Sequence, residues 1–259
     1  MPRVDRVYEG EQPLTGGNAT PGWAVRHGDT VRKPWRANTD LVRGYMSVLA
    51  DRGVPVPRHF GRDDRGRQVI AFIPGALAHD QGPLNEDQLI AVGQLIRRLH
   101  DVSESVPVVG GDWDVLIPSP EPADLLCHND LAPWNLVLHD GSMTFIDWDG
   151  AGPSTREWDL AYAAQSFAGI DPSTPPEIAG RRLRCVLDGY APSKQLRREL
   201  PVVIVQRTKA MHELLRTSAR AGRQPWAAMF ASGHGAYWSA ATDYAAEHIS
   251  AWCEASRGE

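Results

Sequence analysis

The sequence contains few cysteines, no long apolar run and no surplus of basic residues. Its 259 residues include three cysteines, an odd number, with no C-x-x-C pair. This argues against a disulfide framework and favours a reducing compartment. No segment approaches the roughly 18 consecutive apolar residues of a membrane-spanning helix, and the first residues lack the apolar core of a secretory leader. We therefore expect a cytoplasmic protein without a membrane partner.

The charge balance is mildly acidic. A formal net charge of -5 argues against nucleic acid as a partner and would suit a cationic ligand. With 42% hydrophobic and 23% charged residues, the chain can bury a sizeable core. It can form either one large domain or two closely packed lobes, and no internal repeat or low-complexity tract interrupts it.

Most of the residues that point to a reaction lie between residues 126 and 149. A short loop carries His128, Asp130 and Asn135, two apolar strands joined by a His-Asp-Gly turn follow, and Asp147 comes where the second strand ends. The loop Asp can accept a proton from a hydroxyl, while the Asn and the later Asp can hold Mg²⁺. Each residue also has an ordinary structural use, but the joint spacing favours kinase-type phosphoryl transfer.

This stretch resembles the aminoglycoside phosphotransferase family, the small-molecule kinases with a protein-kinase-like fold. The segment His128–Asn135 is similar to that family's H-G-D-x-x-x-x-N loop, Phe145–Asp149 to its I-D-W-D/E metal motif, and Glu157–Ala161 to its D-L-A helix start. Asn129 stands where the family usually has glycine, which we expect to alter only the loop backbone. Asp159 in the last motif is expected to anchor the loop.

The resemblance implies an α+β, two-lobed fold. A small β-rich, nucleotide-binding lobe would occupy residues 1–73, and a larger, mainly helical lobe for catalysis and substrate binding would occupy residues 74–259. Apolar periodicity predicts one helix from Thr39, as its cap, to about Arg52, and another over Leu84–His100. Further helical patterns cover Glu157–Phe167, Glu177–Tyr190, Ser193–Ala221 and Pro225–Cys253.

Near the N-terminus, the sequence predicts a β-hairpin with its turn at residues 27–29. The kinase layout places a phosphate-pairing lysine on the second strand. Because side chains alternate along a strand, only one of two neighbours can face the cleft; we assign Lys33, with Arg32 as the alternative. The family has an ion-pairing helix after this hairpin, but the helix predicted here has no Glu in its interior. The partner of the lysine therefore stays open.

Four more residues are assigned to nucleotide binding. Gly16 and Gly17, before the hairpin, would let the backbone approach a phosphate, although an ordinary loop is the alternative. Phe72 and Ile73 end the last strand of the small lobe, where the family's hinge offers backbone N–H and C=O groups to adenine. Plain core positions are the alternative for these two.

The resemblance also implies the role of each catalytic residue. Asp130 orients the acceptor hydroxyl and accepts its proton, Asn135 and Asp147 hold Mg²⁺ against the phosphates, and Lys33 neutralises charge on the nucleotide. His128 braces the loop. The chain is thus expected to be an enzyme that uses ATP or GTP together with Mg²⁺.

The expected substrate is a small molecule with a hydroxyl group, in the first place an aminoglycoside or similar antibiotic. A choline, ethanolamine or sugar kinase and a catalytically silent pseudokinase are alternatives, whereas a protein kinase is disfavoured because no D-F-G or A-P-E motif follows Asp147. Asp149 and Glu157 are assigned to acceptor binding, with assistance at a second metal position as the alternative for Asp149. Together with Asp171 and Glu213, they predict a hydroxylated amine as the acceptor.

Overall fold

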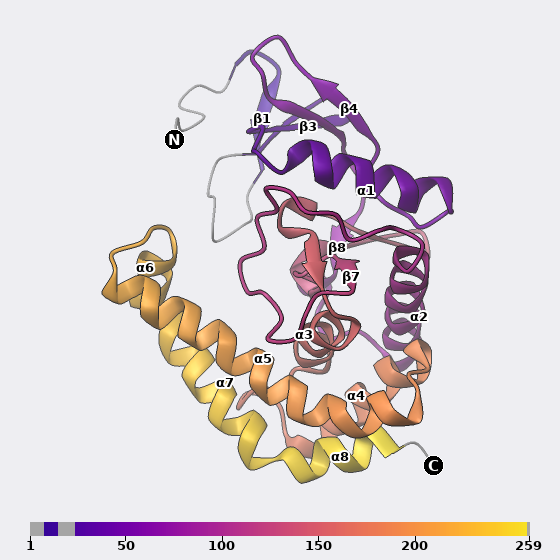
Figure 1. The fold of residues 1–259 in the computed structure, drawn as a ribbon, viewed down its shortest axis with the longest axis vertical. Coiled ribbons are helices and arrows are strands. Elements are labelled where there is room, and N and C mark those ends of the chain that lie inside the picture. The colour runs from indigo at the N-terminus through magenta and orange to yellow at the C-terminus, as the bar shows by residue number, and fades with distance from the viewer. Residues whose placement is uncertain (1–7, 15–23, 258–259) are drawn as a thin grey trace.

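The computed structural model describes residues 8–14 and 24–257 and shows two lobes (Figure 1). The N-terminal lobe is an antiparallel sheet with strand order β1-β2-β3-β5-β4, accompanied by helix α1 (Thr39–Asp51). Its strands are β1 (Glu11–Pro13), β2 (Val25–His27), β3 (Thr30–Lys33), β4 (His59–Arg62) and β5 (Gln68–Ala71). The predicted hairpin is present, and Gly28 in its turn has a φ of 58°, which glycine adopts without strain.

Two details of this lobe differ from the sequence predictions. Strand β1 was not predicted, because three residues ending in Pro13 are too few to show a strand pattern. Thr39 was expected to cap α1 but is its first residue, and Asn38 occupies the cap position without a side-chain cap. The Thr39 hydroxyl instead accepts a hydrogen bond of 2.9 Å from the backbone N–H of Arg36.

The C-terminal lobe is mainly helical, as predicted. Its helices are α2 (Glu86–Ser103), α3 (Arg156–Ala168), α4 (Pro176–Tyr190), α5 (Lys194–Arg220), α6 (Trp226–Met229), α7 (Gly235–Glu247) and α8 (Ile249–Arg257). Helices α2 and α4 approach closely at Gly93, where a Cβ atom would lie 2.1 Å from the carbonyl oxygen of Val186. Within residues 8–14 and 24–257, no helix combines the length and the apolar character needed to cross a membrane.

Short strands hold both ends of the loop over residues 128–135. Before it, β7 (Leu125–Cys127) pairs with β10 (Gly152–Ser154). After it, β8 (Leu136–His139) and β9 (Ser142–Phe145) form the predicted hairpin, and β6 (Ala76–Leu77) pairs with the other edge of β8. Strands β6, β7 and β10 were not predicted, because two or three residues show no period. The loop is therefore fixed by sheet pairing at both ends.

The last part of the chain folds differently from the single helix predicted over Pro225–Cys253. It forms α6, a π-helical turn (Phe230–His234), α7 and α8, and Gly233 interrupts the helical backbone with a φ of 110°. A small apolar cluster joins α7 to α3, α5 and the 128–135 loop. We call it the α5–α7 cluster, and its buried members are Ala132, Tyr162, Met211, Leu215, Trp238 and Ala241.

Candidate active site

The 128–135 loop is braced from inside by His128, whose side chain is buried. Its Nδ1 accepts a hydrogen bond from the backbone N–H of Asp130 at 3.3 Å, and its Nε2 donates to the carbonyl oxygen of Ile146 at 3.1 Å. Burial lowers the pKa of His128, so the neutral ring with its proton on Nε2 satisfies both bonds. The imidazole thus ties the loop to the end of β9, in agreement with the bracing role expected for it.

Asn129 adopts a left-handed backbone, with a φ of 67°, a region that asparagine tolerates better than most side chains. Its backbone N–H donates to Asp159 Oδ1 at 2.8 Å, and its side-chain amide donates to the carbonyl oxygens of Gly150 (3.1 Å) and Gly152 (3.3 Å). The asparagine therefore provides the backbone conformation needed at this glycine position. It also links the loop to the segment that follows Asp147.

Asp130 and Asn135 form one unit within the loop. The Asn135 side chain lies in a 3₁₀ turn (Pro133–Asn135) and is buried. Its Nδ2 donates to Asp130 Oδ2 at 2.7 Å and to the Asp130 carbonyl oxygen at 3.0 Å. Because the nitrogen is used in this way, the amide oxygen is the atom left to face a metal ion. Burial raises the pKa of Asp130, and the nearby charge of Asp147 adds to this effect, which makes its carboxylate a stronger base.

Lys33 reaches across from the N-terminal lobe to two carboxylates. Its Nζ lies 3.0 Å from Asp147 Oδ1 and 2.7 Å from Asp149 Oδ1. Burial opposes the charge on this lysine, but the two carboxylates raise its pKa overall, and Lys33 in turn lowers the pKa of Asp147. Arg32 pairs with Asp63 at 3.6 Å. Of the two candidates, Lys33 is therefore the one that joins the metal-motif carboxylates.

The same contacts show which residues pair with this lysine. Lys33 pairs with Asp147 and Asp149 rather than with an acid from α1. Helix α1 contributes through its N-terminal flank instead, where Asn38 Nδ2 donates to the Asp149 carbonyl oxygen at 2.8 Å. Asp147 itself has a left-handed backbone (φ 60°, ψ 60°), a conformation that in non-glycine residues often marks a functional site.

Comparisons with known proteins agree with this geometry. The family model described as "Phosphotransferase enzyme family" matches residues 109–196. The trifolitoxin immunity protein of Rhizobium leguminosarum bv. trifolii is 30% identical over 199 residues, which are 71% of this chain and 75% of that relative. The chain belongs to the phosphotransferase enzyme family.

Solved structures share the fold of this phosphotransferase family member. An amicoumacin kinase in complex with AMP-PNP, Ca²⁺ and Ami superposes with a TM-score of 0.64 at 16% identity, covering 91% of this chain and 88% of that chain. A spectinomycin phosphotransferase in complex with ADP and spectinomycin gives 0.59 at 15% identity, covering 92% of each chain. A choline/ethanolamine kinase family protein from Mesorhizobium loti gives 0.58 at 18%, covering 95% and 92%. The two-lobed, protein-kinase-like fold is confirmed.

The remaining predicted site residues lie in different surroundings in this family member. Gly16 and Gly17 fall outside the described residues. Phe72 and Ile73 directly follow β5. The N–H of Phe72 donates to the carbonyl oxygen of Asp29 at 2.9 Å, so this N–H is not free for an adenine ring. Glu157 lies half-buried in the first turn of α3.

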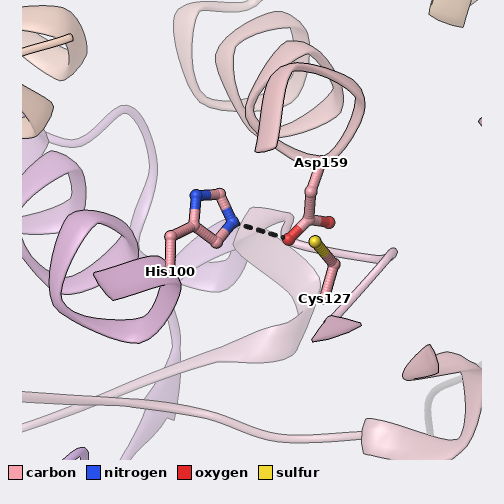
Figure 2. A group of neighbouring side chains, drawn as sticks. All are labelled: His100, Cys127 and Asp159. Atoms are coloured by element: carbon pink, nitrogen blue, oxygen red, sulfur yellow. Dashed lines mark hydrogen bonds and ion pairs between the residues drawn. The ribbon is translucent and has the colours of Figure 1, made fainter. Parts of the chain in front are cut away.

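A buried cluster beneath the loop was only partly predicted (Figure 2). Asp159, expected as the loop anchor, also binds His100, with Oδ2 and Nε2 3.0 Å apart, and His100 Nδ1 lies 2.9 Å from the Tyr190 hydroxyl. The ligand atoms of His100, Cys127 and Asp159 lie within 4.8 Å of one another. However, both imidazole nitrogens are already hydrogen-bonded and burial raises the pKa of the Cys127 thiol, so we interpret the cluster as a hydrogen-bonded support rather than a metal centre.

Proposed function

We propose that this phosphotransferase family member transfers the terminal phosphoryl group of ATP or GTP to a hydroxyl of a small molecule in a Mg²⁺-dependent reaction. One observation carries this proposal: two bonded pairs lie on segments that His128 holds together, since its ring is bonded to the backbone of Asp130 and to that of Ile146, next to Asp147. Asp130 and Asn135 are 2.7 Å apart, and Lys33 and Asp147 are 3.0 Å apart. These are the residue types that phosphoryl transfer needs for proton acceptance, metal binding and charge neutralisation.

The donor set fits Mg²⁺. Asp147 and Asn135 offer the carboxylate and amide oxygens that this cation binds, and the Asp147 side chain is 49% exposed, which leaves room for phosphate oxygens and water. When bound, Mg²⁺ would neutralise charge on the phosphates. Lys33, on the other side of the same carboxylate, would add its positive charge to the nucleotide.

In the proposed reaction, the chain's own residues orient the acceptor and move a single proton. The Asp130 carboxylate accepts the proton of the acceptor hydroxyl while that oxygen forms a bond to the terminal phosphorus. The bond from this phosphorus to the leaving nucleoside diphosphate breaks in the same exchange. Asn135 holds the Asp130 carboxylate in place, and His128 fixes the backbone that carries it.

For the acceptor class, we propose an antibiotic or similar toxic small molecule. The curated relative is named for immunity to a toxin, and two of the solved structures that share the fold are antibiotic kinases. The fold is shared equally by a choline/ethanolamine kinase family protein, so an amino alcohol is the second candidate.

We also propose which lobe binds each substrate and in which compartment the enzyme works. We assign nucleotide binding mainly to residues 1–73 and acceptor binding to residues 74–259. We place the enzyme in the cytoplasm, where ATP is available and where the three free cysteines of the structure would stay reduced. A net charge of -5 does not favour nucleic acid or an anionic membrane as a partner.

The test is a phosphotransfer screen with the purified full chain. The protein is incubated with Mg-ATP or Mg-GTP and a panel of antibiotics and amino alcohols, and diphosphate release is followed together with the mass of each acceptor. We expect one acceptor class to gain a phosphoryl group. Nucleotide binding without transfer to any acceptor would instead identify a pseudokinase.

A further inference from the structure

Arg207, on α5, is a buried cation without an acidic partner. Only 4% of its surface is exposed, and its Nη1 is buried without a hydrogen-bond partner. Among the described residues, the Arg207 side chain has no hydrogen-bond or ion-pair partner; its guanidinium lies over the Tyr162 ring at 4.2 Å and near the Trp158 ring at 5.7 Å. Arginine stays charged at neutral pH. Its nearest groups are aromatic rings, and the carboxylates of Asp130 and Asp159 act on it without being bonded to it.

Other shielded arginines of this protein are paired. Arg67 binds Glu11 at 2.7 Å and Asp63 at 2.9 Å, and Arg156 binds Glu104 at 2.6 Å. Burying a charge without a partner is unfavourable, and a ring face compensates only part of the loss. Arg207 differs from these arginines because no described carboxylate lies within ion-pair distance of it, which leaves its Nη1 without a partner.

The surroundings of Arg207 place it on the acceptor side of the proposed active site. It lies one helical turn before Met211, a member of the α5–α7 cluster that also includes Ala132 of the 128–135 loop. Its guanidinium lies over the Tyr162 ring at 4.2 Å, and the side chain of Tyr162 is hydrogen-bonded to Asp130. The guanidinium thus sits close to the group that we propose as the base, on the side formed by α3, α5 and α7.

Aromatic rings connect this buried charge to the surface. Tyr162, which lies under Arg207, has its ring centroid 6.3 Å from that of Trp238 and 6.4 Å from that of Trp134. Tyr237 follows at 5.3 Å from Trp238. Trp134 is 42% and Tyr237 44% exposed. We call these four residues the aromatic wall; it extends from solvent to the guanidinium.

Three of the four acidic side chains that the sequence assigns to a cationic acceptor are bound within the protein; Glu157 is the fourth. Asp149 pairs with Lys33 at 2.7 Å, and Glu213 pairs with Arg216. Asp171 accepts a hydrogen bond of 3.2 Å from the Tyr237 hydroxyl. Each of these three carboxylates already has a partner in the protein, whereas the guanidinium of Arg207 has none. Arg207 is therefore the better candidate to bind a charged group of a ligand.

We propose that Arg207 binds a carboxylate of the acceptor, whose remaining surface packs on the aromatic wall. This inference rests on the proposed function and narrows the acceptor to hydroxylated acids and zwitterions. A planar guanidinium fork matches a carboxylate in shape and charge. A monoanion fits better than a phosphate dianion, because the Asp130 carboxylate nearby would repel the second negative charge. This assignment is an alternative to the cationic acceptor predicted from the sequence.

The experiment uses matched acceptors that differ in one carboxylate. The pairs are L-serine against ethanolamine, and the antibiotic acid mupirocin against its methyl ester. Their affinities for the full chain with bound Mg-AMP-PNP are measured by calorimetry for the wild type, Arg207→Met and Arg207→Lys. Arg216→Met, which changes a half-buried arginine on the same helix that pairs with Glu213, is the control.

We expect the carboxylate member of at least one pair to bind about tenfold more tightly than its partner in the wild type. The preference should vanish in Arg207→Met, persist in part in Arg207→Lys and remain unchanged in Arg216→Met. Arg207→Met should melt no lower than the wild type, because it removes an unpaired buried charge; if it fails to fold, the lysine variant decides.

Absence of a carboxylate preference in the wild type, whether both members bind equally or neither binds, overturns the proposal. A carboxylate preference that survives in Arg207→Met also overturns it. So does an equal loss of nucleotide affinity and acceptor affinity in that variant. Because binding is measured with a nucleotide that cannot transfer its phosphoryl group, the result is independent of turnover. Failure of the phosphotransfer screen would overturn the proposed function alone.

Discussion

Two polar clusters support the 128–135 loop, and they are built from different contacts. Between the lobes, Lys33 forms ion pairs with Asp147 and Asp149, and Asp147 is half exposed. Beneath the loop, the side chains of His100 and Asp159 are fully buried and their polar atoms are hydrogen-bonded. The first cluster can exchange partners with a ligand. The second cannot lose a partner without leaving a buried polar group unsatisfied.

This difference separates the groups that we assign to chemistry from the groups that maintain geometry. A side chain that must bind a metal ion or a phosphate has to be accessible, and it has to be held by contacts that a ligand can replace. A side chain that fixes a backbone does best where water cannot compete. Substitutions in the two clusters should therefore affect different measurements.

The largest effect is expected at Asp130. Changing it to Ala removes the proposed base, so kcat should fall by about 10²–10⁴-fold. Nucleotide affinity should stay near the wild-type value, because Lys33 and Asp147 remain. Single-turnover phosphotransfer and fluorescence titration with a labelled nucleotide measure the two quantities. Near-wild-type turnover would show that Asp130 is not the base.

The next largest effect is expected at Asp147, in the cluster that Lys33 forms with Asp147 and Asp149. Asp147→Asn removes one negative charge from the proposed metal site, and the affinity for Mg-nucleotide should fall by about tenfold or more. Asp140→Asn is the matched control, since Asp140 lies in the β8–β9 turn with 91% of its side chain exposed. If magnesium titrations of Asp147→Asn and wild type superimpose, the metal assignment is wrong.

In the buried cluster, the expected effect is on stability. His100→Phe deprives the Asp159 carboxylate of its partner, and we expect the free energy of unfolding to fall by about 3 kcal/mol. Urea denaturation measures this change. His79→Phe, at an exposed His–Asp pair, should have little effect. Weakened nucleotide binding without loss of stability in His100→Phe would contradict the division between the clusters.

The smallest effect concerns pH. Burial raises the pKa of Asp130 and the charge of Lys33 lowers that of Asp147. As pH falls, the base should be protonated first, above the value of about 3.9 for a free aspartate, and kcat/KM should decrease there. Mg-nucleotide affinity should persist to lower pH. A pH series of both quantities tests this order, and a simultaneous loss would argue against it.

Much of the site could be predicted from local sequence, because its residues are close in the chain. The spacing from His128 to Asn135 predicts a loop that leads into a β-hairpin. Strand alternation lets only one of Arg32 and Lys33 face the cleft, and the kinase layout calls for a lysine there. The fold class followed from the same motifs.

Residues whose roles depend on distant segments could not be found in this way. His100 ends an ordinary amphipathic pattern, and nothing in its own segment indicates that Asp159 lies 3.0 Å away. Arg207 falls on a helix with many charged residues, so its burial is visible only once α3 and α7 are in place. Asp149 was assigned to the acceptor because sequence cannot show that β3 brings Lys33 to it.

The ion pairs of Lys33 also matter for the design of inhibitors. In the structure this lysine lies between two carboxylates, and Arg36 lies 3.7 Å from the Asp149 carboxylate. A compound that enters where we propose the nucleotide binds therefore meets two positive and two negative charges, with little net charge. A neutral, adenine-like compound would leave these bonds intact and gain affinity from shape alone. A phosphate mimic would need a metal ion to offset the negative charge of Asp147, which favours uncharged scaffolds as starting points against this enzyme.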